Sequence, residues 1–351
     1  MITFIITNIT NCGGTERVVV SQVNYLVQQG YKVEIISFTS REGEQSFFDL
    51  NPSVNIHHLG IRSYEHGGLL DKLKGYVDSF LTFRKYLNVY VTDIIIGTSR
   101  NTNILSVINK PVNTRIIGCE HFQYYNPSPI VRIIRNFYYR KLETLIVLTN
   151  RDLCLYQKKG IHAVCIPNAV PFPLQEDFTS KSKIAIAVGR NSYEKNFGLL
   201  LRLWKQIGNK AWKLKIIGEG PLLEENKKLV KELGIVNVEF VPFTKNIVDY
   251  YKEATIYLMT SRFEAFPMVL LEAKTCGCVC VSFDCETGPR DIIQNDMDGF
   301  LIPVGNNELF VSRVKLLMDN PSMCWKMGKQ AIENSKLYTK EVILRKLEDI
   351  I

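Results

Sequence analysis

Short apolar runs recur along the chain and alternate with segments whose apolar residues have helical spacing. In the first half, runs of strand length occupy residues 2–7, 32–38, 93–97, 114–118 and 144–148. In the second half, similar runs occupy residues 184–188, 214–217, 238–240, 256–259 and 279–283. Helical stretches such as 17–29 and 131–142 separate several of them, and this alternation is typical of parallel sheets. The pattern predicts an α/β fold with two doubly wound units in tandem.

The length and a proline-rich segment locate the boundary between the two units. A chain of 351 residues is about right for two domains of roughly 170 residues each. Three prolines and a charged stretch follow residue 166, as expected of a hinge. We therefore predict an N-terminal domain over 1–168 and a C-terminal domain over 169–330. Residues 331–351 have helical spacing and no strand partner, so we expect a helix that crosses back toward the N-terminal domain.

The composition is that of a soluble globular protein, and it argues against a disordered or fibrous chain. Residues 2–9 lack the basic flank and cleavage site of a signal peptide, and no window is long and apolar enough to span a membrane. Nine cysteines without a regular spacing fit a reducing compartment, so we expect a cytoplasmic protein. Cys276, Cys278 and Cys280 lie in a strand-like run, which favours small buried side chains over metal ligands.

The net charge of +8 comes mainly from residues 1–168. Such a surface attracts polyanions, which include nucleic acid, anionic lipid and phosphorylated substrates, and charge alone does not choose among them. Residues 121–142 contain no acidic side chain, and their four basic residues are Arg132, Arg135, Arg140 and Lys141. Arranged as a helix, residues 130–142 form either a basic amphipathic face for an anionic membrane or an ordinary helix packed on its sheet.

Two glycine-containing loops follow predicted strands. Gly13 and Gly14 come after the first strand and open a helix, where small residues let the backbone approach an anion; an ordinary strand-to-helix turn is the alternative. Gly218 begins Gly-Glu-Gly-Pro, which has only two of the three glycines of a dinucleotide fingerprint. This second loop predicts a tight turn and argues weakly for a nicotinamide cofactor.

The loop after the strand at 184–188 carries two cations five residues apart, Arg190 and Lys195. Arginine binds phosphate oxygens with a planar fork and lysine acts as a point charge, so the pair suits a diphosphate. A solvated basic loop is the alternative.

The segment 261–277 holds two glutamates, Glu264 and Glu272. Pro267 suits the start of a helix and Gly277 its end, so we expect Glu264 in the loop and Glu272 within the helix. A carboxylate in an apolar helix is costly to bury unless it binds something, such as ribose hydroxyls or a salt-bridge partner. Asp296 and Asp298 have the Asp-x-Asp form of some metal sites, but they precede a glycine in a predicted turn.

The order and spacing of these motifs resemble the family-four retaining glycosyltransferases of the GT-B fold, in which two Rossmann-like domains face a central cleft. The resemblance is tightest over residues 184–305. It implies that Arg190 and Lys195 hold the donor diphosphate, Glu272 the ribose and Glu264 a sugar hydroxyl. It further implies that the backbone of Phe266, Pro267, Met268 and Val269 completes the donor cradle. His121 matches a histidine that faces the donor sugar.

The resemblance also implies a retaining hexosyltransferase that needs no metal or other cofactor, because the cations neutralise the leaving diphosphate. The stretch 284–293 is similar to that of bacterial enzymes using UDP-linked sugars. We expect a UDP-hexose or UDP-N-acetylhexosamine donor and a glycan or polyprenyl- or lipid-linked acceptor in surface polysaccharide synthesis. A UDP-sugar 2-epimerase of similar fold and a basic nucleic-acid-binding protein stay open as alternatives, although no nucleic-acid recognition motif is present.

Overall fold

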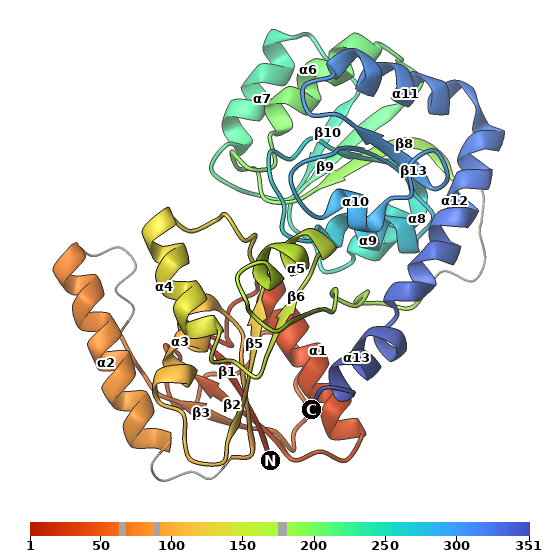
Figure 1. The fold of residues 1–351 in the computed structure, drawn as a ribbon. Coiled ribbons are helices and arrows are strands. Elements are labelled where there is room, and N and C mark those ends of the chain that lie inside the picture. Colours follow the sequence, from red (N-terminus) through yellow and green to blue (C-terminus); the bar gives the residue numbers. More distant parts are fainter. Residues whose placement is uncertain (63–67, 88–91, 175–180) are drawn as a thin grey trace. The chain divides into compact units, whose positions relative to one another are not determined.

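The chain forms two compact units, each built on its own sheet (Figure 1). The computed structural model describes residues 1–62, 68–87, 92–174 and 181–351. Unit 1 comprises Met1–Pro167 together with Leu344–Ile351, and unit 2 comprises Asn168–Ile343.

Unit 1 contains a seven-stranded parallel sheet in the order β3-β2-β1-β4-β5-β6-β7. Its strands are β1 Ile2–Ile6, β2 Val33–Ser37, β3 Asn55–His58, β4 Ile94–Gly97, β5 Arg115–Glu120, β6 Thr144–Val147 and β7 Ala163–Cys165. Its helices are α1 Gly14–Gln28, α2 Leu69–Leu87, α3 Arg100–Ile108, α4 Pro129–Tyr139, α5 Asn150–Gln157 and the end of α13 Lys340–Glu348. The strand order is that of a doubly wound unit.

Unit 2 repeats this design with a six-stranded parallel sheet in the order β10-β9-β8-β11-β12-β13. Its strands are β8 Ser182–Val188, β9 Lys213–Ile217, β10 Val238–Val241, β11 Ala254–Met259, β12 Val279–Phe283 and β13 Gly299–Ile302. Its helices are α6 Phe197–Ile207, α7 Leu223–Glu232, α8 Ile247–Glu253, α9 Met268–Thr275, α10 Pro289–Ile292, α11 Asn307–Asp319 and α12 Pro321–Ser335.

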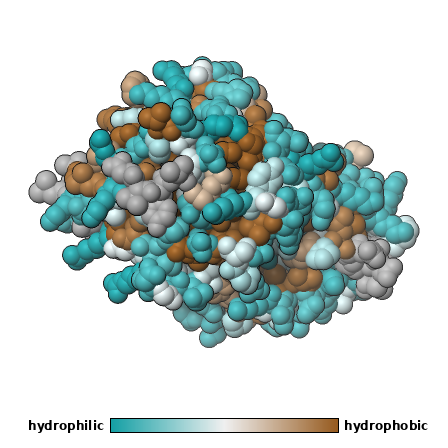
Figure 2. All heavy atoms as spheres, turned by 90° about the horizontal axis from the view of Figure 1, so that it is seen from below, coloured by the Kyte–Doolittle hydropathy of each residue, from teal (hydrophilic) through white to brown (hydrophobic). Residues whose placement is uncertain are grey.

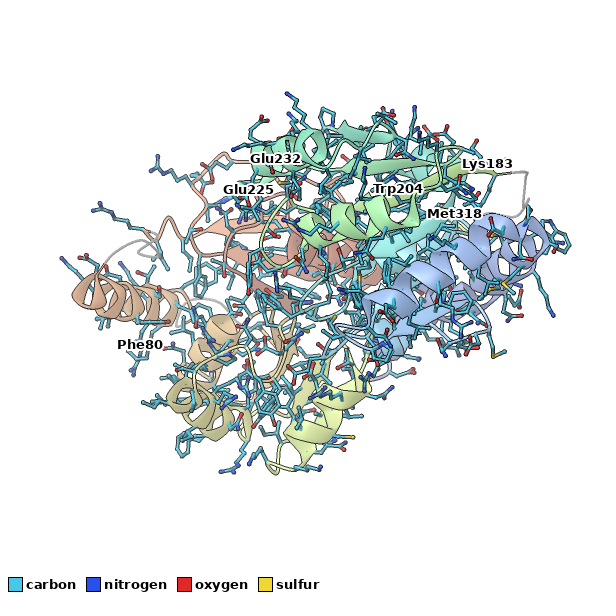
Figure 3. The ribbon with its side chains drawn as sticks, turned by 90° about the horizontal axis from the view of Figure 1, so that it is seen from above. Phe80, Lys183, Trp204, Glu225, Glu232 and Met318 are labelled. Atoms are coloured by element: carbon cyan, nitrogen blue, oxygen red, sulfur yellow. The ribbon has the colours of Figure 1, made fainter. Side chains whose placement is uncertain are left out.

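Helices cover both faces of each sheet, so the central strands are apolar on both sides. The strand β12 is buried at every position. On one face of the unit 2 sheet, Trp204 of α6 and Met318 of α11 belong to the same hydrophobic core (Figure 3). This burial explains why the sequence shows continuous apolar runs at the strands rather than alternation.

The predicted two-unit parallel α/β fold is confirmed, and all ten predicted strands are present. Three strands escaped prediction, namely β3, β7 and β13, and each lies at an edge of its sheet. Strands β3 and β7 are only partly buried, so a polar sequence such as Asn-Ile-His-His in β3 suffices there. Strand β13 is mostly buried but has only four residues. The helix α2 also escaped prediction.

The C-terminal segment is not the single helix predicted over 331–351. Helix α12 begins at Pro321 and ends at Ser335, a 3₁₀ turn covers Lys336–Tyr338, and α13 follows. Within unit 2, the turn is fixed by a hydrogen bond from Val170 N to Tyr338 O at 2.8 Å. Within unit 1, Tyr25 Oη donates to Glu348 Oε2 at 3.1 Å.

A buried ion pair ties three elements of unit 2 together. Lys274 Nζ on α9 lies 2.7 Å from Asp298 Oδ2, which precedes β13, and both side chains are fully buried. Asn334 Nδ2 on α12 donates to the same carboxylate oxygen at 2.6 Å. Gln294 N donates to the other oxygen at 2.9 Å. The carboxylate is thus hydrogen-bonded on both oxygens, which compensates part of its desolvation.

We expect Lys274→Ala to lower the free energy of unfolding of unit 2 by about 3–5 kcal/mol, because it leaves Asp298 buried without its cation. All three tryptophans, at 204, 212 and 325, belong to unit 2, so tryptophan fluorescence during urea denaturation reports on this unit. The control is Lys228→Ala, which removes an exposed pair with Glu232 and should change stability little. Equal losses in the two variants would contradict a structural role for the buried pair.

Candidate active site

The loops that follow β8, β9, β11 and β12 lie at one edge of the unit 2 sheet. The strands are parallel and adjacent in the order β9-β8-β11-β12, so their carboxyl ends meet at this edge. Ligands of doubly wound sheets bind beyond this edge. All but one of the candidate residues predicted in the C-terminal half lie in the β8 and β11 loops or in α9, and Gly218 lies in the β9 loop.

The β8 loop is held by the buried side chain of Asn191. Its Nδ2 donates to Gly218 O at 2.8 Å, and its Oδ1 accepts from Asn226 Nδ2 of α7 at 3.0 Å. The neighbouring Arg190 is exposed. The anchored asparagine therefore fixes the backbone of the loop while the arginine side chain extends into solvent.

Two glycines of the β9 loop are required by close packing of backbone against backbone. Gly218 has φ +126°, and a Cβ there would lie 2.3 Å from Gly189 O. Gly220 has φ +152°, and a Cβ there would lie 2.5 Å from Asn191 O. The predicted tight turn is confirmed, and its glycines are explained by contact with the β8 loop.

Lys195 and Glu264 join the β8 and β11 loops. Lys195 Nζ lies 2.6 Å from Glu264 Oε1, and both side chains are largely buried, with 19% and 12% exposed. The hydroxyl of Thr287, from the loop after β12, donates to the backbone carbonyl of Glu264. A buried ion pair of this kind fixes the positions of both charged groups.

The cations of the β8 loop also act on Glu194. A hydrogen bond from Ser192 lowers the pKa of this carboxyl, and the charges of Arg190 and Lys195 lower it further.

Arg262 of the β11 loop donates to Tyr193 O at 3.2 Å and to Asn196 Oδ1 at 3.1 Å. The two loops are thus fastened together on both sides of Lys195.

Helix α9 begins and ends at the predicted residues. Pro267 is its N-cap, and Gly277, at φ +73°, follows its C-terminus. Gly277 N donates to Lys274 O at 2.8 Å and Cys278 N to Ala273 O at 2.9 Å, which is a Schellman motif. In the first turn, the N–H groups of Met268 and Val269 have no acceptor within the helix.

One member of the predicted backbone cradle does not fit. Pro267 has no N–H, so it cannot donate a hydrogen bond to a ligand. Its contribution is the fixed φ of −74° that directs the chain into α9. A Cβ at Gly288 would lie 2.5 Å from Pro267 Cδ, so the loop after β12 packs directly on this turn. The ring of Phe266 is buried.

Glu272 lies within α9, as predicted, and its side chain is buried. Tyr251 Oη on α8 donates to Glu272 Oε2 at 3.0 Å. Burial raises the pKa of Tyr251 well above its ordinary value, and the nearby Glu272 carboxylate raises it further. Burial likewise raises the pKa of Tyr257 on β11, with smaller contributions from Glu264 and Glu272. The two glutamates therefore flank a pair of tyrosines that stay protonated.

The remaining predicted site residues belong to unit 1. Gly13 is the N-cap of α1 and Gly14 its first residue, and both follow β1. Neither has a positive φ, and a Cβ at Gly14 would meet no atom within 4 Å. Neither the backbone conformation nor packing within the described residues therefore demands glycine at position 14.

His121 directly follows β5, at the carboxyl edge of the unit 1 sheet. Its Nε2 is buried and has no hydrogen-bond partner in the described residues. Burial lowers the pKa of His121 to about 4. The neighbouring Glu120 accepts a hydrogen bond from Tyr139 Oη at 2.8 Å, so this acidic group is engaged elsewhere.

The cysteines and the Asp-x-Asp pair have structural explanations. Cys276, Cys278 and Cys280 are buried, as predicted, and Cys278 Sγ donates to Tyr251 O at 3.1 Å. Asp298 is engaged by Lys274 as described above. Among residues 1–62, 68–87, 92–174 and 181–351, no three His, Cys, Asp or Glu side chains are grouped so as to hold a metal ion.

Three residues that support the site were not found from the sequence. Tyr251 holds Glu272, Asn191 anchors the β8 loop and Thr287 braces Glu264. Each acts through a contact with a residue at least 21 positions away in the sequence. A tyrosine in a short helix is indistinguishable by pattern from an ordinary core residue, so only the tertiary structure identifies it.

The two parallel sheets and their loops define a two-domain Rossmann-like protein of the GT-B type. Residues 173–334 match the family model described as glycosyl transferases group 1. The chain is 31% identical to the amylovoran biosynthesis glycosyltransferase AmsD of Erwinia amylovora, over 99% of this chain and 98% of that protein. The chain belongs to the group 1 glycosyltransferase family, and it is a glycosyltransferase.

Two further comparisons extend this finding. An undecaprenol-diphosphate-glycan α-1,4-N-acetyl-D-galactosaminyltransferase of Campylobacter jejuni is 26% identical, over 97% of this chain and 94% of its own. The crystal structure of S. aureus TarM in complex with fondaparinux, α-GlcNAc-glycerol and UDP is similar in fold, with a TM-score of 0.82 and 14% identity over 99% of both chains. The predicted GT-B fold and the prediction of a glycosyltransferase are confirmed.

We expect Gly218→Ala to disrupt the contact between the β8 and β9 loops, because the added methyl group would overlap Gly189 O. Overpacking of this kind costs about 1–3 kcal/mol, in addition to backbone strain. The control is Gly234→Ala, which also has a positive φ but meets no atom within 4 Å. Urea denaturation followed by tryptophan fluorescence should show a larger loss for position 218. A loss no greater than that of the control would contradict the packing explanation.

We also expect the imidazole of His121 to stay neutral down to about pH 4, because its burial disfavours the charged form. Between that value and the ordinary pKa of about 6.5, the unfolded chain binds a proton that the folded protein does not. This group therefore makes folding less favourable as the pH falls from about 6.5 to 4. Histidine side-chain NMR titration should reveal a resonance with a midpoint near 4 that is missing from His121→Gln. A midpoint near 6.5 would contradict the prediction.

Proposed function

We propose that this glycosyltransferase moves a hexose or N-acetylhexosamine from a UDP-linked donor, with retention at the anomeric carbon, to a glycan or lipid-linked acceptor of a bacterial surface polysaccharide. The observation that carries the proposal is the ion pair between Lys195 and Glu264. It holds a cation and a carboxylate 2.6 Å apart, beside the start of α9. These are the two groups that a sugar diphosphate requires, one for its phosphates and one for a sugar hydroxyl.

In this proposal the donor diphosphate replaces Glu264 as the partner of Lys195. Lys195 turns from the carboxylate to the phosphate oxygens, and the exposed Arg190 adds its planar fork. The N–H groups of Met268 and Val269, at the positive end of α9, supply two more donors. Glu264, released from Lys195, accepts a hydrogen bond from a sugar hydroxyl.

The ribose is assigned to Glu272. Its carboxylate is held by Tyr251, so it is oriented before the ligand arrives. A buried carboxylate that accepts hydrogen bonds from both ribose hydroxyls recovers part of its desolvation cost.

The bond between the anomeric carbon and the diphosphate breaks as the acceptor oxygen attacks the same face of the sugar. The electron pair of the breaking bond goes to the diphosphate, where Arg190 and Lys195 stabilise the charge. The proton of the acceptor hydroxyl goes to the departing phosphate oxygen. The family resemblance assigns His121 to the donor sugar, and burial lowers the pKa of this imidazole to about 4, so near neutral pH it can offer a hydrogen bond but no charge.

The comparisons support the substrate classes. The TarM structure contains UDP, and the name of the C. jejuni relative specifies an N-acetylgalactosaminyl group and an undecaprenol-diphosphate glycan. The AmsD relative acts in amylovoran biosynthesis.

The most informative experiment is a panel of UDP- and GDP-linked sugars with undecaprenyl-linked or lipopolysaccharide acceptors. Release of UDP that depends on the acceptor supports transfer, whereas conversion of the donor without an acceptor would support an epimerase.

Separate variants distinguish the roles of Lys195 and Glu264. Lys195→Ala should weaken binding of UDP and reduce transfer by about 10²–10³-fold, because it removes a cation from the leaving group. Glu264→Gln should bind UDP at least as tightly as wild type, because Lys195 loses its competitor, yet transfer should still fall by about 10–100-fold. Titration calorimetry with UDP and a UDP-release assay measure the two effects.

The matched controls are Lys213→Ala and Glu239→Gln, which alter an exposed ion pair of unit 2 outside these loops. Both should leave binding and transfer near wild type. If Glu264→Gln weakened UDP binding as much as Lys195→Ala, the exchange of partners would be wrong.

The role of Glu272 is tested with UDP and 2′-deoxy-UDP. Wild type should prefer UDP by about tenfold, the value of one hydrogen bond to a charged group. In Glu272→Ala this preference should vanish, because the variant lacks the carboxylate that accepts a hydrogen bond from the 2′-hydroxyl. An unchanged preference in the variant would place the ribose elsewhere.

A further inference from the structure

Helix α4 is the yellow helix of Figure 1. Its polar side faces the core of unit 1, and its apolar side is exposed. The inward side includes Arg135, Asn136 and Tyr139, all of which are buried. Arg135 donates from Nη1 to Tyr124 O at 2.9 Å. Its guanidinium carbon also lies 4.5 Å and 4.7 Å from the ring centroids of Tyr124 and Tyr156.

This orientation corrects the sequence interpretation of residues 130–142. One of the two alternatives placed Arg135 on a basic, membrane-facing surface, but it is a core residue. Its charge is compensated by carbonyl oxygens and aromatic faces rather than by solvent. An amphipathic pattern indicates two faces of a helix, but it does not indicate which face contacts the protein.

The outward side of α4 is a ridge of four large apolar residues. Ile130, Ile133, Ile134 and Phe137 have spacing i, i+3, i+4 and i+7, and they are 71%, 71%, 48% and 54% exposed. We call these four residues the α4 ridge. Exposed apolar side chains occur elsewhere too, and Figure 2 shows brown residues interleaved with teal ones on one face. The α4 ridge differs in being continuous along one side of a helix.

Cations surround the α4 ridge and no acidic residue lies near it in sequence. The Arg132 guanidinium carbon lies 4.9 Å from the ring centroid of Tyr125, and Lys141 Nζ lies 4.8 Å from that of Phe137. Arg140 is exposed. A row of apolar side chains bordered by Arg and Lys complements an anionic lipid surface, where the side chains enter the headgroup region and the cations meet phosphates.

The size of the α4 ridge favours a membrane over a protein partner. A stable protein interface buries about 800 Å² per partner, with about 20–30 residues on each side. Four side chains on one helix fall well short of this, whereas shallow insertion into a bilayer gains strength from each apolar residue and each cation separately. In the described part of the chain, no helix has the length and hydropathy to cross a membrane.

We infer that the α4 ridge docks this enzyme on the surface of an anionic membrane, by insertion of Ile130, Ile133, Ile134 and Phe137 and attraction of Arg132, Arg140 and Lys141. Docking goes beyond the proposed transfer reaction. It requires neither donor nor acceptor, so either proposal can fail while the other stands.

The test is flotation of the full chain with vesicles of phosphatidylethanolamine and phosphatidylglycerol, compared with vesicles of phosphatidylcholine alone. We expect wild type to float with the anionic vesicles, and less so at high salt. The triple variant Ile130→Ser, Ile133→Ser, Phe137→Ser and the double variant Arg140→Glu, Lys141→Glu should each lose at least about tenfold in vesicle affinity. Arg135 is left unchanged because it is in the core.

The matched control is Val77→Ser, Leu81→Ser, which removes two exposed apolar residues from α2, where Asp78 lies between them. It should float as wild type does. Circular dichroism and UDP binding verify that the variants are folded, as expected for exposed positions. In a second measurement, Ile133→Trp should show a blue shift of fluorescence on anionic vesicles.

Three results would overturn the inference. The first is absence of wild-type flotation, and the second is flotation of the triple variant at the wild-type level. The third is a dimer in solution that the triple variant converts to a monomer, since the α4 ridge would then be a contact between two copies of the chain.

Discussion

The parallel pairing of the strands is the constraint on which the rest of the protein depends. In the described residues, every strand pairs with its neighbours in the parallel sense. A parallel connection must return across a face of the sheet, so helices cover both faces and the strands become apolar throughout. Polar chemistry is thereby confined to the loops at the ends of the strands. The ion pair, the glycine contacts and the start of α9 all lie at one such edge.

The loops at this edge are fixed by contacts with one another rather than by regular secondary structure. Asn191 and the two close glycine contacts lock the β8 loop to the β9 loop, while Lys195 and Arg262 lock it to the β11 loop. Thr287 then holds the β11 loop from the far side. Such mutual support holds the backbone of these loops in place, so that binding of the proposed donor requires only side chains such as Lys195 to change partner.

Both units bury charged side chains in their cores. In unit 2, Lys274 and Asp298 neutralise each other within the core. In unit 1, Arg135 is buried among tyrosines, backbone carbonyl and amide oxygens. Because Arg135 points inward, the helix that carries it presents isoleucine and phenylalanine to solvent. The polar core of unit 1 and the exposed α4 ridge are therefore consequences of the same orientation of one helix.

The sequence by itself determined the two-unit parallel fold, ten of its strands, the bounds of α9 and the location of Glu264 and Glu272. These follow from local signals, namely apolar runs, a proline at a helix start and a glycine after its end. It also indicated which residue types suit a sugar diphosphate. The tertiary structure alone decided that Lys195 pairs with Glu264, that Tyr251 holds Glu272 and that Arg135 faces the core. Each of these depends on which residues distant in sequence meet in space, and the periodicity of a helix specifies its two faces without specifying which one the protein covers.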